Sequence, residues 1–174
     1  KNIYYMLSYA FTALEQGGYE DVAAEEFENL HDLFAAILAK GISRLLKQGL
    51  YREYVPRREE LAALRGKLEM PGTIRDRLAR KRLLACEYDV LSENCQLNRM
   101  LKTTALLLLR HARVAQARKD DLKRVLLFFA DVETIEPGNI RWSSIRFKRN
   151  NATYRLLIGL CRLIVEGMLL TTDS

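Results

Sequence analysis

A carboxylate one residue before a lysine is the pattern that a magnesium-dependent nuclease places beside a further aspartate, since the carboxylates hold the metal and the lysine orients water. The only short match in this chain is Asp121-Leu122-Lys123. A helix is expected to begin there, and an aspartate at a helix start is explained as an ordinary N-cap. A phosphate-binding loop is not indicated either, because Arg65-Gly66-Lys67-Leu68 lacks the first glycine and the hydroxyl of that motif. We therefore expect no catalytic residue in this chain.

The histidines and cysteines do not form a metal site at the spacing that the sequence shows. His31 and His111 each lack a second histidine or cysteine at helical ligand spacing, so we interpret both as surface or helix-end residues. Cys86, Cys95 and Cys161 stand among apolar residues and fit neither zinc-ligand spacing nor a disulfide framework. We expect buried free thiols in a reducing compartment and no bound metal.

Arginine and lysine are the residues best suited to binding, because their charged groups match phosphates and carboxylates. They gather in clusters along the chain. The clusters are Arg52, Arg57, Arg58, Arg65 and Lys67; then Arg75, Arg77, Arg80, Lys81 and Arg82; and last Arg141, Arg146, Lys148 and Arg149 with Trp142 and Phe147 between them. An aromatic neighbour could stack on a base. A solvated surface, offset by nearby glutamates, remains the alternative interpretation of each cluster.

The composition is that of an ordinary globular protein, with 49% hydrophobic and 29% charged residues. The formal net charge of +6 permits a polyanion or an acidic protein surface as partner, and a soluble protein that is simply basic is the alternative interpretation. The longest apolar run, residues 104–109, is far too short to cross a bilayer, and no signal-peptide pattern opens the chain. We expect a cytoplasmic protein without a membrane contact.

The elements that would carry the basic clusters are mostly helical. Apolar residues at helical spacing predict helices over about residues 2–14, 29–47, 93–117 and 152–170. A further helix is expected to begin at Asp120 or Asp121, where the aspartate would be the cap.

Between residues 50 and 90 the apolar pattern changes to a period of two. It predicts strands at 50–55, 64–70 and 84–90, a turn at 56–60, a stop at Pro71-Gly72, and a basic segment at 75–82. The predicted fold class is therefore α+β and mostly helical: a small antiparallel β-sheet or hairpin in the first half, followed by a helical bundle. We expect one domain over residues 1–174, with a hairpin appendage at about 50–70.

Several motifs resemble those of the McrC family, the nuclease subunits of McrBC 5-methylcytosine restriction systems. They are residues 2–11 (NIYYMLSYAF), 40–42 (KGI) with 49–54 (GLYREY), 64–68 (LRGKL) with 73–75 (TIR), 86–94 (CEYDVLSEN) and 97–104 (LNRMLKTT). Their order and spacing are similar to the N-terminal, non-nuclease part of that family along nearly the whole chain.

The resemblance implies an adaptor and not an enzyme. In the family, a C-terminal domain carries the magnesium-dependent nuclease, and this domain is expected to lie outside the present chain. The implied partner is a McrB-type AAA+ GTPase hexamer, whose GTP hydrolysis McrC stimulates and couples to cutting of methylcytosine-containing DNA. We expect no cofactor in this chain: Mg²⁺ belongs to the absent nuclease domain, and GTP to the partner. Any contact with DNA is expected to be indirect or non-specific.

The leading hypothesis places the GTPase-stimulating contact on the hairpin, at Arg57, Arg58, Arg65 and Lys67. Arg65 and Lys67 are expected to share one face of a strand, while Leu64, Leu68 and Met70 pack on the helices. The alternative is a DNA-contacting domain that guides duplex to the nuclease. Its candidate residues are Arg75, Arg77, Arg80, Lys81, Arg82, Arg146, Lys148 and Arg149. A complete nuclease of unknown type is the third possibility.

Overall fold

The computed structural model describes residues 2–79, 82–148 and 151–172. The chain divides into two compact units. The helical unit comprises Lys1–Tyr51 and Gln96–Ser174, and the inserted unit comprises Arg52–Cys95. The insertion leaves the helical unit after Tyr51 and re-enters it at Gln96.

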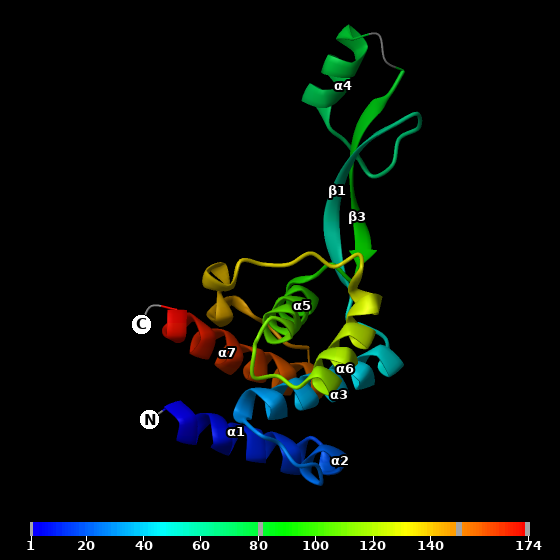
Figure 1. Ribbon diagram of the computed structural model, residues 1–174. Coiled ribbons are helices and arrows are strands. Elements are labelled where there is room, and N and C mark those ends of the chain that lie inside the picture. Colours follow the sequence, from blue (N-terminus) through cyan, green and yellow to red (C-terminus); the bar gives the residue numbers. More distant parts are fainter. Residues whose placement is uncertain (1, 80–81, 149–150, 173–174) are drawn as a thin grey trace. The chain divides into compact units, whose positions relative to one another are not determined.

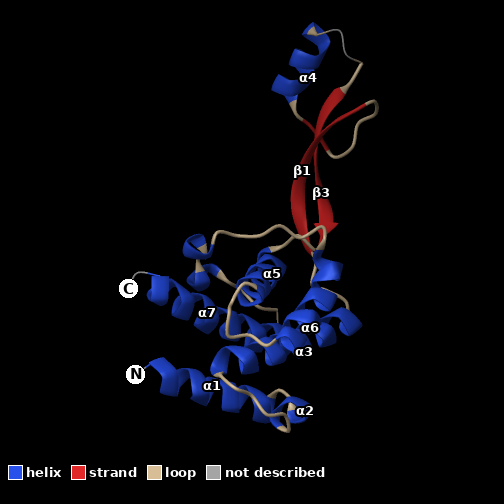
Figure 2. Ribbon diagram, viewed as in Figure 1, coloured by secondary structure: helices blue, strands red, loops and turns tan. Residues whose placement is uncertain are grey.

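The helical unit contains α1 (Asn2–Gln16), α2 (Glu20–Ala23), α3 (Leu30–Gln48), α5 (Gln96–Leu109), α6 (Gln116–Leu126) and α7 (Ala152–Thr172) (Figures 1 and 2). Short 3-10 turns at Leu127–Phe129, Pro137–Asn139 and Trp142–Ser144 join α6 to α7. Helix α3 packs against α5, α6 and α7. Its apolar face, including Phe34, Ile37 and Leu38, is fully buried, and the hydrophobic burial of this face stabilises the bundle.

The expected long helix over residues 93–117 is wrong at its end, because α5 stops at Leu109 and α6 begins at Gln116. Asp120 and Asp121 therefore lie inside α6 and do not cap it. The start of α6 is held from α3 instead: the Asp32 carboxylate accepts a hydrogen bond from the Ala115 N–H (2.9 Å). Asn29 caps α3 and also donates to the Arg113 carbonyl (2.7 Å). Because this cap comes from a residue more than 80 positions away, the sequence around residue 116 carries no local pattern that marks the start of α6.

The inserted unit contains β1 (Glu53–Leu61), β2 (Lys67–Leu68), α4 (Met70–Leu78) and β3 (Leu84–Ser92), with the strand order β1-β3-β2. Strands β1 and β3 form a long antiparallel ribbon (Figure 2), in register from Glu53 opposite Ser92 to Leu61 opposite Leu84. The turn expected at 56–60 is wrong, because these residues lie inside β1. Pro56 is tolerated there because β1 is an edge strand.

The strand expected at 64–70 is reduced to two residues, and the partner of β1 is β3. Pro71-Gly72, expected to stop a strand, lie in the first turn of α4, where a missing N–H costs nothing. The Glu69 carboxylate caps this helix by accepting from the Gly72 N–H (2.9 Å). The basic segment at 75–82 is therefore helical as far as Leu78. The α+β, mostly helical fold class is confirmed.

The cysteines are buried and free, as expected. In the part of the chain that the structure describes, no helix is long and apolar enough to span a membrane.

Candidate partner-binding site

The first basic cluster lies in the inserted unit, along β1, in the loop that follows it and on β2, and is exposed. We call Arg57, Arg58, Arg65 and Lys67 the ribbon cations, because each lies on or beside the β1–β3 ribbon. The Arg57 guanidinium lies 3.5 Å from the Glu59 carboxylate, and that of Arg58 lies 3.9 Å from the Glu87 carboxylate. Both pairs are open to solvent, and such pairs contribute little to stability. The arginines are therefore oriented by their neighbours and remain accessible to another molecule.

Arg65 is positioned by an aromatic ring. Its guanidinium carbon lies 4.2 Å from the centre of the Tyr88 ring, which is a cation–π contact. The Tyr88 hydroxyl donates to the Glu59 carboxylate (2.6 Å), and this hydrogen bond raises the pKa of Tyr88. A contact of this kind restricts the side-chain conformations of Arg65 before any partner binds.

Gly66 allows the loop that carries Arg65 to close on β3. Its φ is +66°, and a Cβ at this position would lie 2.4 Å from the Glu87 carbonyl oxygen. Only glycine has both the left-handed freedom and the space that this approach requires. The glycine turns the chain between Arg65 and Lys67.

The four cations divide between the two faces of the ribbon. Arg57 lies opposite Tyr88, so Arg57 and Arg65 share the face of Tyr88. Arg58 and Lys67 both lie opposite Glu87, which is on the other face. The expectation that Arg65 and Lys67 share a face is therefore wrong, because Gly66 reverses the local direction. Leu64 and Met70 are exposed and do not pack on helices as expected.

The second cluster lies in the same unit. Arg75 and Arg77 are exposed on α4, and Arg82 is exposed just before β3. Arg80 and Lys81 lie outside the described residues. The third cluster belongs to the helical unit, where Arg146 donates to the carbonyls of Ser143 (3.0 Å) and Ile145 (3.1 Å). Lys148 lies 5.4 Å from the Tyr51 ring, and Arg149 lies outside the described residues.

Two side chains of the helical unit, Asn98 and Tyr154, close a hydrogen-bond ring with the backbone of Tyr51 where the insertion leaves and returns. The Tyr51 N–H donates to the Tyr154 hydroxyl (2.8 Å), which donates to the side-chain amide oxygen of Asn98 (2.8 Å). The Asn98 amide donates in turn to the Tyr51 carbonyl (2.9 Å). Asn98 is fully buried. Sequence reasoning missed this ring, although an asparagine on the buried side of α5 was a visible signal.

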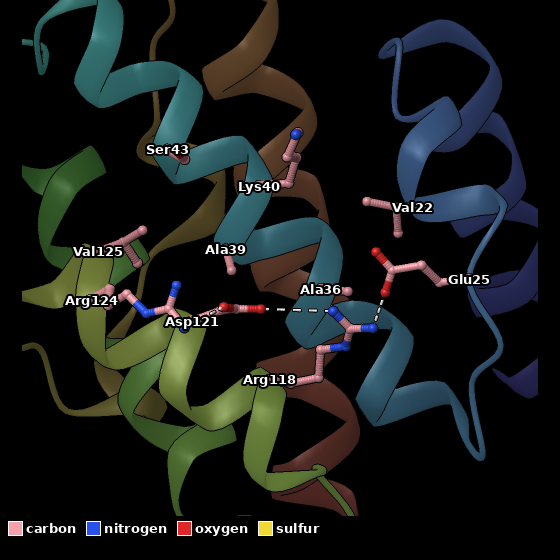
Figure 3. Close-up of a pocket in the computed structure, with 10 residues that line it drawn as sticks. All are labelled: Val22, Glu25, Ala36, Ala39, Lys40, Ser43, Arg118, Asp121, Arg124 and Val125. Carbon is pink, nitrogen blue, oxygen red and sulfur yellow. Dashed lines mark hydrogen bonds and ion pairs between the residues drawn. The ribbon is translucent and has the colours of Figure 1, made fainter.

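A charged pocket of about 350 Å³ lies between α2, α3 and α6 of the helical unit (Figure 3). Its charges are matched: Arg118 contacts both Glu25 and Asp121, and Arg124 lies 3.3 Å from Asp121. Lys40 lies 3.2 Å from Asp21. Asp121, which belongs to the nuclease-like match Asp121-Leu122-Lys123, thus contacts two arginines. The described residues contain no group of three or more His, Cys, Asp or Glu that could hold a metal.

His31 and His111 lie at helix ends as expected, in the first turn of α3 and just after α5, and their rings stack with centres 4.0 Å apart. Burial lowers the pKa of both, and the neighbouring His111 lowers that of His31 further. The stack joins the first turn of α3 to the segment after α5, next to the bonds made by Asn29 and Asp32.

Comparison with known proteins gives a consistent set of relatives. The family described as "McrBC 5-methylcytosine restriction system component" matches residues 1–173. A curated relative from Escherichia coli (strain K12), "Type IV methyl-directed restriction enzyme EcoKMcrBC", is 27% identical over 96% of this chain. The chain spans about half of that relative, 48% of its length.

Two solved structures from Thermococcus gammatolerans are similar. One, a half-complex from a tetradecameric assembly of McrB AAA+ hexamers with bound McrC, is 26% identical with a TM-score of 0.61; the match covers 80% of this chain and 33% of that chain. The other, a cryo-EM structure of the McrBC complex, is 22% identical with a TM-score of 0.64; the match covers 99% of this chain and 58% of that chain.

Proposed function

Because this chain belongs to the family of McrBC 5-methylcytosine restriction system components, we propose that it acts as a McrC-type adaptor that binds a McrB-type AAA+ GTPase hexamer. The observation that carries this proposal is the similarity to a solved assembly described as McrB AAA+ hexamers with bound McrC. The adaptor stimulates GTP hydrolysis by the hexamer and couples it to a nuclease domain outside this chain. GTP is bound by the partner, and Mg²⁺ by the nuclease domain.

The ribbon of the inserted unit is the proposed stimulating element. Arg57 and Arg65 lie on one face and Arg58 and Lys67 on the other, so the ribbon can present cations to protein on two sides at once. That arrangement suits an element surrounded by the subunits of a ring better than an element lying on a flat surface.

The chemistry of stimulation follows from the charge that develops during phosphoryl transfer. A positioned cation can stabilise this charge directly, or it can reorient a partner residue that does so. We favour reorientation, because one asymmetric subunit cannot place one arginine in every active site of a ring. Arg65 is the best prepared of the four, since its stacking on Tyr88 reduces the conformational entropy that binding would remove.

The test is GTP hydrolysis by the cognate McrB-type protein with the wild-type chain and with R57Q/R58Q/R65Q/K67Q. Loss of charged hydrogen bonds, each contributing about 1.5–3 kcal/mol, should lower the stimulated rate by about tenfold or more. The matched control removes as many exposed cations from the helical unit, in K47Q/R110Q/K123Q/R141Q. If both variants stimulate as the wild type does, the ribbon cations do not make the contact.

The second candidate function is guidance of duplex DNA by the exposed Arg75, Arg77 and Arg82. Binding of DNA through phosphates would weaken steeply as salt rises, because counterions re-condense on the released duplex. A salt titration of binding to duplex DNA and to the AAA+ protein separates the two functions.

A further inference from the structure

Helix α4 turns its large apolar side chains away from its own unit. The residues that it buries are small or polar: Gly72, Thr73 and Asp76. Met70, Ile74 and Leu78 remain 54%, 52% and 82% exposed. At about 100° per residue, these three form one stripe that lies nearly opposite the buried face. An amphipathic helix of a folded domain normally buries such a stripe.

The helix cannot roll to bury the stripe, because its inner face is fixed to β3. The Ala85 N–H donates to the Thr73 hydroxyl (3.0 Å), and that hydroxyl donates to the Glu69 carbonyl (2.9 Å). The Glu69 N–H donates to the Ala85 carbonyl (2.7 Å). A Cβ at Gly72 would lie 2.8 Å from the Ala85 Cβ, so the backbone approaches β3 as closely as a glycine permits. Rotation would break these contacts.

We propose that the stripe of Met70, Ile74 and Leu78 is the docking surface through which the inserted unit binds the AAA+ partner. This inference rests on the proposed function and adds to it a separate source of affinity: the ribbon cations stimulate, and the α4 stripe binds. Its chemistry specifies the partner surface as an apolar groove with an acidic rim.

The charges around the stripe support this occupant. Measured around the helix from Ile74, the centre of the stripe, Arg77 lies about 60° to one side and Arg75 about 100° to the other. Exposed cations therefore flank the stripe on both sides. Apolar residues at the centre and charges at the rim are the anatomy of a protein interface. A duplex would require cations at the centre of the contact, where this helix presents methionine, isoleucine and leucine.

The first experiment measures the affinity of the chain for its cognate McrB-type AAA+ protein in the presence of a non-hydrolysable GTP analogue. The variant I74S/L78S should bind about ten- to a hundredfold more weakly, as expected for central apolar anchors. The matched control is L127S/F128S, which removes two exposed apolar side chains from the helical unit and should bind within about twofold of the wild type. Both variants should keep the wild-type melting temperature, because the altered side chains are exposed.

The outcomes are distinguishable. Wild-type affinity in I74S/L78S overturns the docking surface and leaves the proposed function standing. Failure of the wild-type chain to bind the AAA+ protein refutes the proposed function and this inference together. Equal weakening in both double variants also overturns the assignment to α4.

The second experiment detects the contact directly. The native cysteines are buried, so L78C supplies an exposed thiol that a benzophenone maleimide can label selectively. Irradiation of the complex should attach the label to the AAA+ protein. A complex that forms without this cross-link, or a label that attaches to added duplex DNA instead, contradicts the inference.

Discussion

Substitution of Asn98 by alanine tests how the helical unit holds the two chain segments that flank the insertion. Asn98 donates to the Tyr51 carbonyl and accepts from the Tyr154 hydroxyl. Its side chain is completely buried. N98A therefore removes the amide that donates to the Tyr51 carbonyl and the side-chain oxygen that accepts from the Tyr154 hydroxyl. Both hydrogen bonds are lost in the protein interior.

The expected loss of stability follows from these two bonds. Removing one partner of a buried hydrogen bond costs about 1–3 kcal/mol, and water entering the space left by the side chain recovers part of that free energy. We expect N98A to lower the free energy of unfolding by about 3 kcal/mol. In a chain of this length, that corresponds to a fall of roughly 6–12 °C in melting temperature.

The assay is thermal unfolding followed by circular dichroism at a helix-sensitive wavelength, with Y154F and the double variant completing a cycle. Because Asn98 and Tyr154 share one bond, the double variant should lose about 1–2 kcal/mol less than the sum of the single variants. Y4F, which alters a tyrosine on the exposed side of α1, should unfold as the wild type does. A shift below about 2 °C for N98A, or additive single effects, would refute this reasoning.

Three further predictions follow from the same structure. G66A should destabilise the chain by about 1–2 kcal/mol in a calorimetric scan and weaken GTPase stimulation, since alanine resists the left-handed φ. The control G138A adds a Cβ into open space and should melt as the wild type does in the same scan. The folded-state pKa values of His31 and His111 are lowered, so their contribution to stability is full above the unfolded pKa of about 6.5 and is lost as the pH falls below it. The melting temperature should therefore fall between pH 7.5 and 5.5, and it should fall less in the variant H111N. An equal fall of the melting temperature in both proteins would exclude the histidine stack as the cause. The chain alone should cut neither methylated nor unmethylated DNA with or without Mg²⁺, and metal-dependent cleavage abolished by a carboxylate substitution would show that an active site had been overlooked.

Local patterns in the sequence predict the helices that bury one face. The period of apolar residues in α3 and α7 and the cap at Asn29 are local features, and the structure places these helices within about two residues of the expectation. Strand β3 is found for the same reason, because its alternation reflects one buried and one open face.

The features that the sequence leaves open depend on distant residues. The partner of β1 is β3 and not the nearer segment at 64–70, and alternation cannot distinguish these pairings. The cap of α6 comes from Asp32, and the two histidines meet across 80 positions of sequence. Helix α4 is missed: residues 75–82 are interpreted only as a basic segment, and Met70 is assigned to a strand, although Met70, Ile74 and Leu78 recur at helical spacing.

The candidate site was predicted in part. The ribbon cations lie together in the inserted unit, as expected, but Gly66 and Tyr88 divide them between two faces. Both residues belong to the motifs 64–68 and 86–94, whose contact with each other only the fold reveals.

The central claim is that this chain is an adaptor for a McrB-type AAA+ hexamer. The most direct test is size-exclusion chromatography with light scattering of the chain mixed with its cognate AAA+ protein and guanine nucleotide. We predict that the chain moves from its own elution position, at 20.1 kDa, to that of the hexamer. Separate elution of the two proteins with every guanine nucleotide, GTP analogues and GDP included, would contradict the account.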